Sequence, residues 1–305
     1  MAALAYSTPS HTVPEPPVPA SVYRRLTVSI VVPALNEAEN LPHILPRIPT
    51  WVHEVLLVDG RSTDDTIAVA CAVLPTVRII TQDGRGKGAA LRSGVAAATG
   101  DIIVLLDADG STDPEEIPYF VGTLIAGADY AKGSRFLHSA GTDDMPLYRQ
   151  LGNQALVTLT NILFSTRYTD ITYGYNAFWR SCSDALALDI DGWACEIVGN
   201  IRVARHGLRV IEVASHEHRR IAGEAKLEAF SAGWTILQAI LREFFAKVTT
   251  PRIQVPRRAV HLEAFVGHHE EPLTYLRYAA PTFTFSQMLD REAPAPRERV
   301  VGESY

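Results

Sequence analysis

The chain has 305 residues, of which 47% are hydrophobic and 20% charged, and its formal net charge is −6. This length and apolar content suffice for one large hydrophobic core, or for one core and a smaller lobe. The acidic balance argues against a nucleic-acid-binding protein, because proteins that follow a phosphate backbone are usually basic.

The two ends of the chain differ in composition from its middle. Residues 1–25 contain five prolines and lack the basic and continuous apolar regions of a signal peptide, so they predict a disordered or extended arm. We expect a single folded domain over residues 26–248. Residues 249–305 are rich in Pro, Arg and Glu, and both a partly disordered tail and a dimer arm stay open for this extension.

The cysteines and the apolar runs bear on where the protein works. Cys71, Cys182 and Cys195 are odd in number and lack zinc-ligand spacing, which favours reduced thiols in a cytoplasmic protein. The chain holds no run of about 18 apolar residues. We therefore predict no transmembrane helix, and at most peripheral contact with the inner face of a membrane.

Short apolar runs alternate with helix-like segments through the first half of the chain. Strands are predicted over residues 27–33, 54–59, 76–81, 101–107 and 130–136. The predicted helices lie between Asn36 and Pro46, between a capping box of Ser62 with Asp65 and about Leu74, after residues 83–88, and from Pro114 onward. This alternation predicts an α/β fold with an open, mostly parallel sheet and helices on both faces.

Four of these strands end in polar or glycine-rich residues. The four clusters are residues 33–37 (PALNE), Asp59 with Gly60, residues 84–88 (GRGKG) and residues 107–109 (DAD). Ligands of open parallel sheets bind outside the carboxyl ends of the strands, so we expect the four clusters to share one rim.

The two acids of the last cluster predict a metal site. Alternate residues of an extended segment point to the same side, so Asp107 and Asp109 can converge on one point. Two carboxylates that close repel each other unless a cation lies between them, and a hard divalent ion prefers such oxygens together with phosphate. The alternative is that both acids cap the helix near Pro114.

The other clusters carry candidate nucleotide contacts. Glycines in residues 83–88 let backbone N–H groups approach a phosphate, while Arg85 and Lys87 add positive charge. This segment is neither a Walker A loop nor a dinucleotide-binding fingerprint, and an exposed basic turn stays open. Asp59 and Glu37 are candidates to accept from a ribose or a nucleobase, with helix capping as the alternative for both.

Together the clusters resemble the family-2 glycosyltransferases with a GT-A fold, especially the polyprenyl-phosphate (dolichol-phosphate) mannosyl- and glucosyltransferase branch. The similar segments are VVPALNEAEN (31–40), LLVDGRSTDDT (56–66), GRGKGAALRSG (84–94), ATGDIIVLLDADGSTDPEEI (98–117), KGSRF (132–136), DITYGYNAFWR (170–180) and HGLRVIEVASHEHRRIAGEAKL (206–227). In this order they cover about residues 27–248 and are strongly specific for the family.

The resemblance implies a metal-dependent, inverting glycosyltransferase that uses a UDP- or GDP-sugar and Mg²⁺ or Mn²⁺. It places the donor against Pro33, Ala34, Asn36, Glu37, Asp59, Gly60, Gly86, Lys87, Asp107, Ala108, Asp109 and Arg135. Asp107 and Asp109 would hold the metal, and Asp109 would take part in catalysis. Arg220 and Lys226 match basic residues near the acceptor phosphate and the leaving group. The resemblance also implies that His216 and His218, which share a strand face, lie near the rim, where His218 would be a further metal ligand; an ordinary surface strand is the alternative.

The acceptor is less well defined than the donor. A polyprenyl phosphate is already an anion, whereas a hydroxyl of a soluble small molecule needs a carboxylate base, for which Asp170 and Glu196 are the candidates. A turn residue and an ordinary helix-face acid are the respective alternatives. The chain departs from the lipid-phosphate enzymes at Ser111, Ala214 and Ala225, which bears on the acceptor. A nucleotidyltransferase and a non-catalytic nucleotide-sugar binder remain more distant alternatives.

An apolar stripe is predicted on a helix over residues 225–248. Its members are Leu227, Phe230, Trp234, Leu237, Leu241, Phe244, Phe245 and Val248. Such a stripe indicates packing against the same domain or against a second copy in a homodimer, and an interfacial helix beside a lipid acceptor is the alternative.

Overall fold

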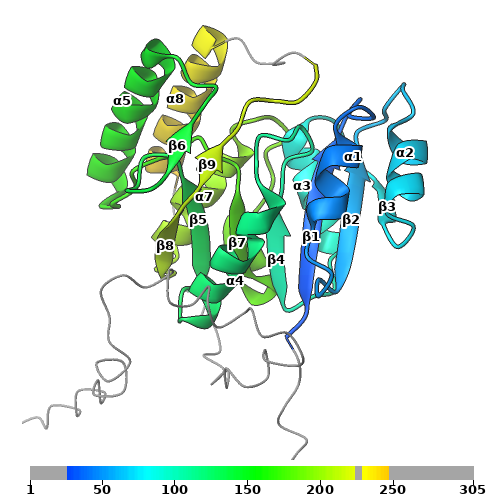
Figure 1. Cartoon of the computed structure of the whole chain (residues 1–305). Coiled ribbons are helices and arrows are strands. Elements are labelled where there is room, and N and C mark those ends of the chain that lie inside the picture. Colours follow the sequence, from blue (N-terminus) through cyan, green and yellow to red (C-terminus); the bar gives the residue numbers. More distant parts are fainter. Residues whose placement is uncertain (1–25, 224–228, 247–305) are drawn as a thin grey trace, which may run out of the picture.

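A computed structural model describes residues 26–223 and 229–246 of the chain. The predicted N-terminal arm, the predicted extension over 249–305 and the candidate catalytic residue Lys226 lie outside the described residues. A central sheet carries helices on both of its faces, as the sequence predicts (Figure 1).

The main sheet has seven strands in the order β3-β2-β1-β4-β7-β5-β8. Their bounds are β1 Val28–Ala34, β2 Glu54–Asp59, β3 Arg78–Thr81, β4 Ile102–Leu105, β5 Tyr130–Ser134, β7 Asn176–Trp179 and β8 Val210–Ala214. The five predicted strands are confirmed, with ends that shift by at most two residues. Strand β7 runs antiparallel between β4 and β5, while the other neighbours pair in parallel. A second, two-stranded sheet joins β6 (Gly141–Thr142) to β9 (His216–Glu217).

The helices connect these strands and cover them. Their bounds are α1 Leu41–Ile44, α2 Thr66–Val73, α3 Lys87–Ala97, α4 Ile117–Ile125, α5 Leu147–Phe164, α6 Ser183–Leu186, α7 Cys195–Arg205 and α8 Ala229–Phe245. Short 3-10 turns extend α1 over Leu45–Arg47, precede α4 over Pro114–Glu116 and precede α6 over Arg180–Cys182.

Two predictions of helix starts have opposite outcomes. Before α4, the side chain of Asp113 accepts from the backbone N–H of Glu115, so Asp113 rather than Asp107 or Asp109 caps this segment. The predicted capping box at α2 is wrong. The hydroxyl of Ser62 accepts from the N–H of Asn36 in the preceding loop, and Asp65 makes no side-chain cap.

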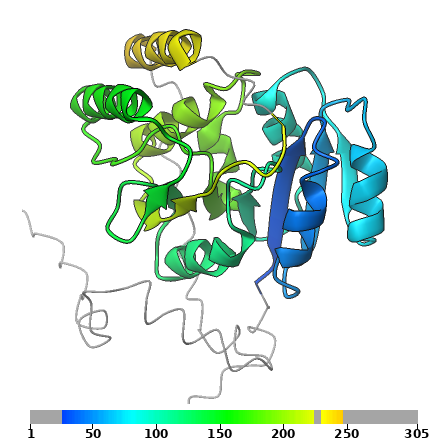
Figure 2. The same ribbon diagram turned by 45° about the horizontal axis from the view of Figure 1, so that its top comes forward.

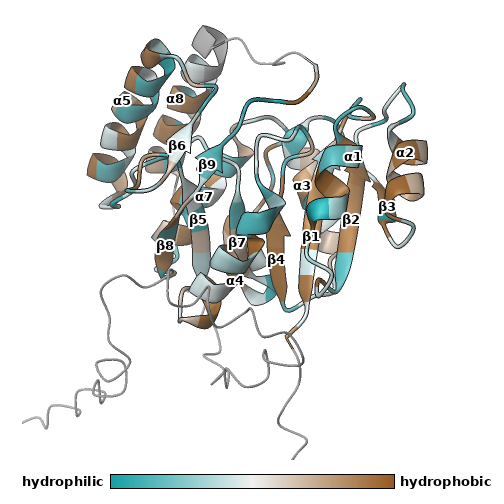
Figure 3. Cartoon of the chain, in the orientation of Figure 1, coloured by the Kyte–Doolittle hydropathy of each residue, from teal (hydrophilic) through white to brown (hydrophobic). Residues whose placement is uncertain are grey.

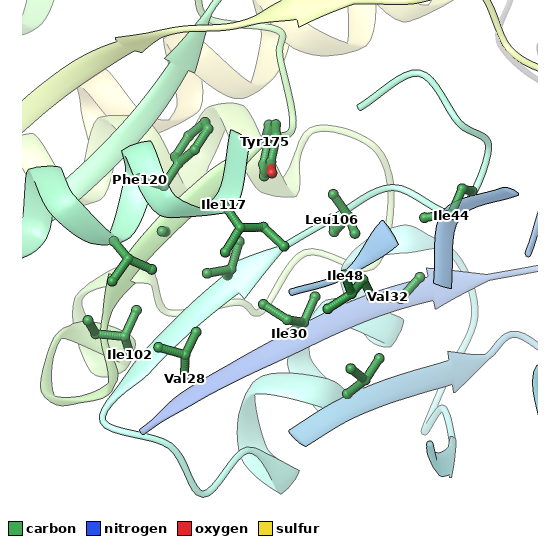
Figure 4. Packing of buried hydrophobic residues seen from close by; sticks show 14 of the residues in the cluster. Val28, Ile30, Val32, Ile44, Ile48, Ile102, Leu106, Ile117, Phe120 and Tyr175 are labelled. Carbon is green, nitrogen blue, oxygen red and sulfur yellow. The ribbon is translucent and has the colours of Figure 1, made fainter. Parts of the chain in front are cut away.

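The core lies on both sides of the sheet because successive strand residues point to opposite faces. Figure 3 shows the central strands as largely hydrophobic. On one face, Ile30 and Val32 of β1 pack with Ile117 and Phe120 of α4, as Figure 4 shows. On the other face, Val31 lies in a separate cluster that includes residues of α3 and α7. This double cover explains why the strands are continuous apolar runs.

Close packing of α3 on the sheet depends on Gly94. A Cβ at this position would lie 2.3 Å from Val31 Cγ1 and 2.8 Å from Val58 Cγ2, both in fully buried side chains. We expect Gly94→Ala to lower the free energy of unfolding by about 1–3 kcal/mol through overpacking, although alanine favours a helix. Gly152→Ala in α5 is the matched control because nothing lies within 4 Å of its Cβ, and it should raise stability by up to about 1 kcal/mol. Urea unfolding measures both, and equal effects would contradict this packing.

Glu54 ties together three segments at the amino ends of the strands. Its carboxylate accepts from the hydroxyl of Ser29 at 2.6 Å, from the N–H and hydroxyl of Thr99 at 2.7 Å, and from Arg78. Burial alone would raise the pKa of Glu54, but these donors lower it to about 2, from an ordinary value of 4.5. The resulting stabilisation is complete above pH 4.5 and is lost as the pH falls toward 2.

We therefore expect Glu54→Gln to destabilise the protein by about 1–3 kcal/mol at pH 7. The difference from the parent protein should shrink steadily below about pH 4.5. Chemical denaturation at pH 7 and at lower pH measures this gap. Glu115→Gln, at an exposed ion pair with Arg47, is the control and should change stability little at either pH. A gap for Glu54→Gln that does not depend on pH would contradict the assigned role.

The buried face of helix α8 differs from the predicted apolar stripe. Ile236 and Ile240 are buried in a cluster with residues of α5 and α7, so α8 does pack against its own domain. The predicted stripe members Trp234, Leu241, Phe244 and Phe245 are exposed instead. The face that includes Ile236 and Ile240 also buries Glu243, which pairs with Arg202 of α7. Leu227 and Val248 of the predicted stripe lie outside the described residues.

Within residues 26–223 and 229–246, no helix combines the length and apolarity required for a membrane span.

Candidate active site

A cavity of about 500 Å³ opens at the carboxyl ends of β1, β2 and β4. It is lined by Pro33, Ala34, Leu35, Glu37, Gly60, Arg61, Gln82, Arg85, Gly86, Lys87, Ala90, Asp107, Ala108, Asp109, Trp193 and Arg220. Residues of all four sequence clusters therefore meet at one rim, as the parallel sheet predicts. Figure 2 turns this rim forward and shows the segment after β9 crossing the sheet toward β1 and α1.

Lys87 lies between two carboxylates at the start of α3. Its Nζ is 2.6 Å from Asp107 Oδ1 and 2.8 Å from Glu196 Oε1 of α7. Burial alone would lower the pKa of Lys87, but Asp107 and then Glu196 raise it above its ordinary value, so the amine stays charged. Burial raises the pKa of Glu196, and the nearby Lys87 opposes this shift.

The glycine-rich loop positions this lysine by close backbone packing. Gly86 has a φ of 86°, and a Cβ there would lie 2.5 Å from the carbonyl oxygen of Asp191. The backbone N–H of Gly88 donates to the same carbonyl oxygen of Asp191 at 2.8 Å. Small residues are thus required where α3 begins, and they bring Lys87 against the end of β4.

Asp109 pairs with a second cation from a distant part of the chain. Arg220 Nη2 lies 2.6 Å from Asp109 Oδ2, and its Nη1 lies 3.5 Å from Glu37 Oε1. The other carboxylate oxygen of Asp109 accepts from the N–H and hydroxyl of Ser111. Asn40 fixes the adjacent backbone by exchanging hydrogen bonds with Ala222. The segment after β9 is therefore anchored across the rim.

The donor atoms of the cavity fit a hard divalent cation. Asp107, Asp109 and Glu37 present carboxylate oxygens to one space, and oxygen is the ligand that Mg²⁺ and Mn²⁺ prefer. Lys87 and Arg220 balance these negative charges in the described structure.

Two predicted donor contacts shape the loops instead of lining the cavity. Asp59 is buried, and its carboxylate accepts from the N–H groups of Arg61 and Ser62. Asn36 adopts a φ of 55°, and its side-chain oxygen accepts from the N–H of Thr63. These hydrogen bonds of Asp59 and Asn36 stabilise the loops after β1 and β2, and those loops carry cavity-lining residues such as Gly60.

Arg135 and Asp170 form a buried ion pair away from the cavity lining. Arg135 Nε lies 2.7 Å from Asp170 Oδ2, and Nη2 lies 3.0 Å from Oδ1. The remaining donors of Arg135 reach Glu217 at 3.0 Å and Thr172 at 2.8 Å. Burial alone would raise the pKa of Asp170, but Arg135 and nearby Lys132 hold it below its ordinary value.

This geometry does not support two of the predicted site roles. Asp170 has no exposed surface and gives both carboxylate oxygens to Arg135, so the described structure does not place it where an acceptor hydroxyl would reach it. Arg135 spends its donors inside the protein and does not line the cavity, so the structure does not bring it to the donor site.

The structure also separates His218 from the cavity lining. His216 and His218 share one face, as predicted, with ring centroids 4.9 Å apart. The imidazole of His218 lies near Asp143 and Asp113, with Nδ1 3.7 Å from Asp143 Oδ2 and Nε2 3.9 Å from Asp113 Oδ2. His218 is therefore not placed as a ligand beside Asp107 and Asp109.

Four lining residues, Arg61, Gln82, Ala90 and Trp193, were not predicted as site residues from the sequence. Arg61 and Gln82 follow the carboxyl ends of β2 and β3. They could have been predicted, because ligands bind at the carboxyl ends of the strands in such sheets. Trp193 comes from the irregular stretch before α7, where no pattern points to a site. Its ring lies 5.5 Å from Lys87 Nζ, within the range of a cation–π interaction.

The architecture of the sheet and its helices is that of the GT-A fold. The chain belongs to glycosyl transferase family 2, whose model matches residues 29–186, just over half of its length.

Two relatives illustrate this membership, and one solved structure shows a similar fold. Undecaprenyl-phosphate mannosyltransferase of Micrococcus luteus is 31% identical over 225 residues, which cover 70% of this chain and 92% of that protein. The uncharacterized glycosyltransferase Rv0539 of Mycobacterium tuberculosis is 42% identical over 108 residues, and the match spans 35% of this chain and 48% of that relative. In fold, the chain is similar to glucosyl-3-phosphoglycerate synthase of M. tuberculosis, solved with Mn²⁺, UDP and phosphoglyceric acid. The TM-score is 0.58 at 24% identity, over 75% of this chain and 82% of that one.

Proposed function

We propose that this glycosyltransferase moves a sugar from a UDP- or GDP-sugar to the phosphate of a polyprenyl phosphate, with inversion at the anomeric carbon and with a divalent cation. The observation that carries the proposal is the cavity in which Asp107 and Asp109 lie against Lys87 and Arg220. Paired carboxylates with flanking cations suit a diphosphate leaving group, which needs both a metal ion and fixed positive charge.

The residues on the donor side stabilise the departing diphosphate. As the bond between the anomeric carbon and the diphosphate oxygen breaks, its electron pair leaves with the nucleoside diphosphate. Lys87 and Arg220 hold positive charge at this position, where it is worth more than in water. A Mg²⁺ or Mn²⁺ ion bound by Asp107 and Asp109 would add charge neutralisation on the same oxygens.

The acceptor side favours a group that is already an anion. Among the described residues, the carboxylates lining the cavity are Glu37, Asp107 and Asp109, and each has a cationic partner. Glu196 forms an ion pair with Lys87, and Asp170 forms a buried ion pair with Arg135. A phosphate monoester attacks the anomeric carbon without giving up a proton, so it needs cationic positioning rather than a base. The similarity to an undecaprenyl-phosphate mannosyltransferase supports the same acceptor class.

Exposed apolar side chains support peripheral contact with the membrane that holds such an acceptor. Helix α5 exposes Leu147, Leu151 and Ile162, and the neighbouring α8 exposes Trp234 and Phe245 (Figure 1). Large apolar residues on adjacent helices suit the boundary between lipid head groups and acyl chains.

Product analysis tests the proposal. The full chain is incubated with Mn²⁺ or Mg²⁺ and radiolabelled UDP-glucose or GDP-mannose. Each mixture receives polyprenyl phosphate in vesicles, a soluble sugar phosphate, or a polyprenol without phosphate. We expect label in the lipid phosphate product from one donor, with inverted anomeric configuration by NMR. Transfer to the polyprenol, or to the soluble acceptor alone, would overturn the assigned acceptor, and retention of configuration would overturn the mechanism.

A further inference from the structure

Three metal-ligating side chains meet on the rim outside the donor cavity. Asp143 follows β6, His216 lies in β9, and His218 follows β9. One potential ligand atom from each of the three lies within 4.8 Å of the others. Their side chains are between 40% and 50% exposed, so an aqueous metal ion can reach them.

The separations are close to, and somewhat longer than, those of ligands around a single ion. His216 Nε2 lies 3.2 Å from Asp143 Oδ1, and His218 Nδ1 lies 3.7 Å from Asp143 Oδ2. Nitrogen and oxygen ligands at roughly 2.0–2.1 Å from a tetrahedral ion are about 3.3 Å apart. Small side-chain rotations therefore suffice to bring all three groups onto one centre.

The backbone around the cluster is held in place without a metal. The N–H of Asp143 donates to the carbonyl of Glu217 at 2.8 Å, and Arg219 Nε donates to the carbonyl of Asp143 at 3.2 Å. Glu217 alternates with the two histidines and points the other way, onto the buried Arg135. This ion pair fixes the strand register, so both imidazoles face Asp143.

Gly141 leaves the space that the first imidazole needs. A Cβ at this position would lie 2.7 Å from His216 Nδ1. The ring therefore lies close against Gly141 of β6, and its other nitrogen, Nε2, lies 3.2 Å from Asp143 Oδ1. Asp113 Oδ2 lies 3.9 Å from the outer nitrogen of His218, which is beyond hydrogen-bond distance.

We propose that Asp143, His216 and His218 form a binding site for a divalent transition metal of the Zn²⁺ type, separate from the donor cavity. Two imidazoles and one carboxylate favour Zn²⁺ over Mg²⁺, which prefers oxygen ligands alone. Three protein ligands leave one coordination position for water or an anion.

Occupation of this site would connect the β6 segment to the segment that closes the donor cavity. The N–H of His218 donates to the carbonyl of Ser111, and Arg220, two residues on, pairs with Asp109. A metal ion at the cluster would therefore restrict the strand end that carries Arg220. The site is defined by its own ligands, so it stands even if the proposed acceptor is wrong.

Metal titration tests the site without reference to sugar transfer. The metal-free full chain is titrated with Co²⁺ in excess Mg²⁺, which competes for the all-oxygen cavity, and the visible spectrum is followed. Zn²⁺ is then added in competition. We expect one equivalent of Co²⁺ with the absorption of a four-coordinate ion, displaced by Zn²⁺. His216→Ala with His218→Ala should weaken Zn²⁺ binding at least about 100-fold, and Asp143→Asn about 10- to 100-fold.

Two control variants locate the ion. His268→Ala with His269→Ala removes the chain's other closely spaced histidine pair and should leave the titration unchanged. Asp107→Asn with Asp109→Asn should also leave it unchanged. Thermal unfolding verifies that each variant is folded. Full binding by the His216 and His218 variant, or loss of binding in either control, would overturn the proposal.

Discussion

Replacing Lys87 with methionine is expected to lower kcat for sugar transfer by about 10²- to 10³-fold. The ammonium group lies in the cavity between Asp107 and Glu196, and an isosteric apolar side chain removes its charge from the departing diphosphate. The substitution also leaves two carboxylates without their shared cation. Initial rates at saturating donor measure the loss, and thermal unfolding verifies that the variant is folded.

Arg92→Met is the matched control for this experiment. Arg92 lies on the same helix, α3, but pairs with Asp191 at the surface, where both side chains are well exposed. We expect kcat to stay within roughly twofold of the parent enzyme, because exposed ion pairs contribute little. A Lys87→Met enzyme that keeps its kcat would show that the lysine is a structural partner of the two acids and no more.

Replacing Asp170 with asparagine is expected to have the largest effect on stability, with a loss of about 3 kcal/mol or more in the free energy of unfolding. The carboxylate is fully buried and accepts two hydrogen bonds from Arg135. Asparagine would leave the buried guanidinium with Glu217 as its remaining acidic partner, and removing one member of a buried charge pair is costly. Urea denaturation measures the change.

Activity distinguishes this structural role from a catalytic one. A base at Asp170 would predict a loss of about 10²- to 10⁴-fold in kcat with little change in stability. The buried pair predicts the reverse, namely a large loss of stability with kcat largely preserved at a temperature where the variant is folded. Asp189→Asn is the control: the Asp189 carboxylate is exposed, and its partner Arg202 keeps Glu243 as a second acidic partner, so the change should cost below about 1 kcal/mol.

The first four strands of the main sheet could be predicted because β1, β2 and β4 are almost entirely apolar and β3 has an apolar centre. Val28 to Val32 are all buried, since α4 and α3 cover opposite faces of β1. The rule that parallel strands present their carboxyl ends together then placed Lys87, Asp107 and Asp109 at one rim.

Long-range pairing could not be predicted from local patterns. Strand β7 enters the sheet between β4 and β5 and runs antiparallel, and nothing in its four residues encodes that position. The pairing of Arg135 with Asp170 joins residues 35 apart, so the resemblance assigned both to the ligand although they bind each other. Likewise, helical periodicity alone could not predict which apolar face of α8 is buried, because that face is determined by packing against α5 and α7.

The central claim, that Asp107 and Asp109 couple donor binding to a divalent cation, is tested most directly by calorimetric titration. UDP and GDP are titrated into the parent protein and into Asp107→Asn with Asp109→Asn, each with and without Mn²⁺. We expect one nucleotide to bind the parent much more tightly when Mn²⁺ is present, and the double variant to bind it with the same affinity in both conditions. A double variant that retains the full effect of Mn²⁺ would contradict the account.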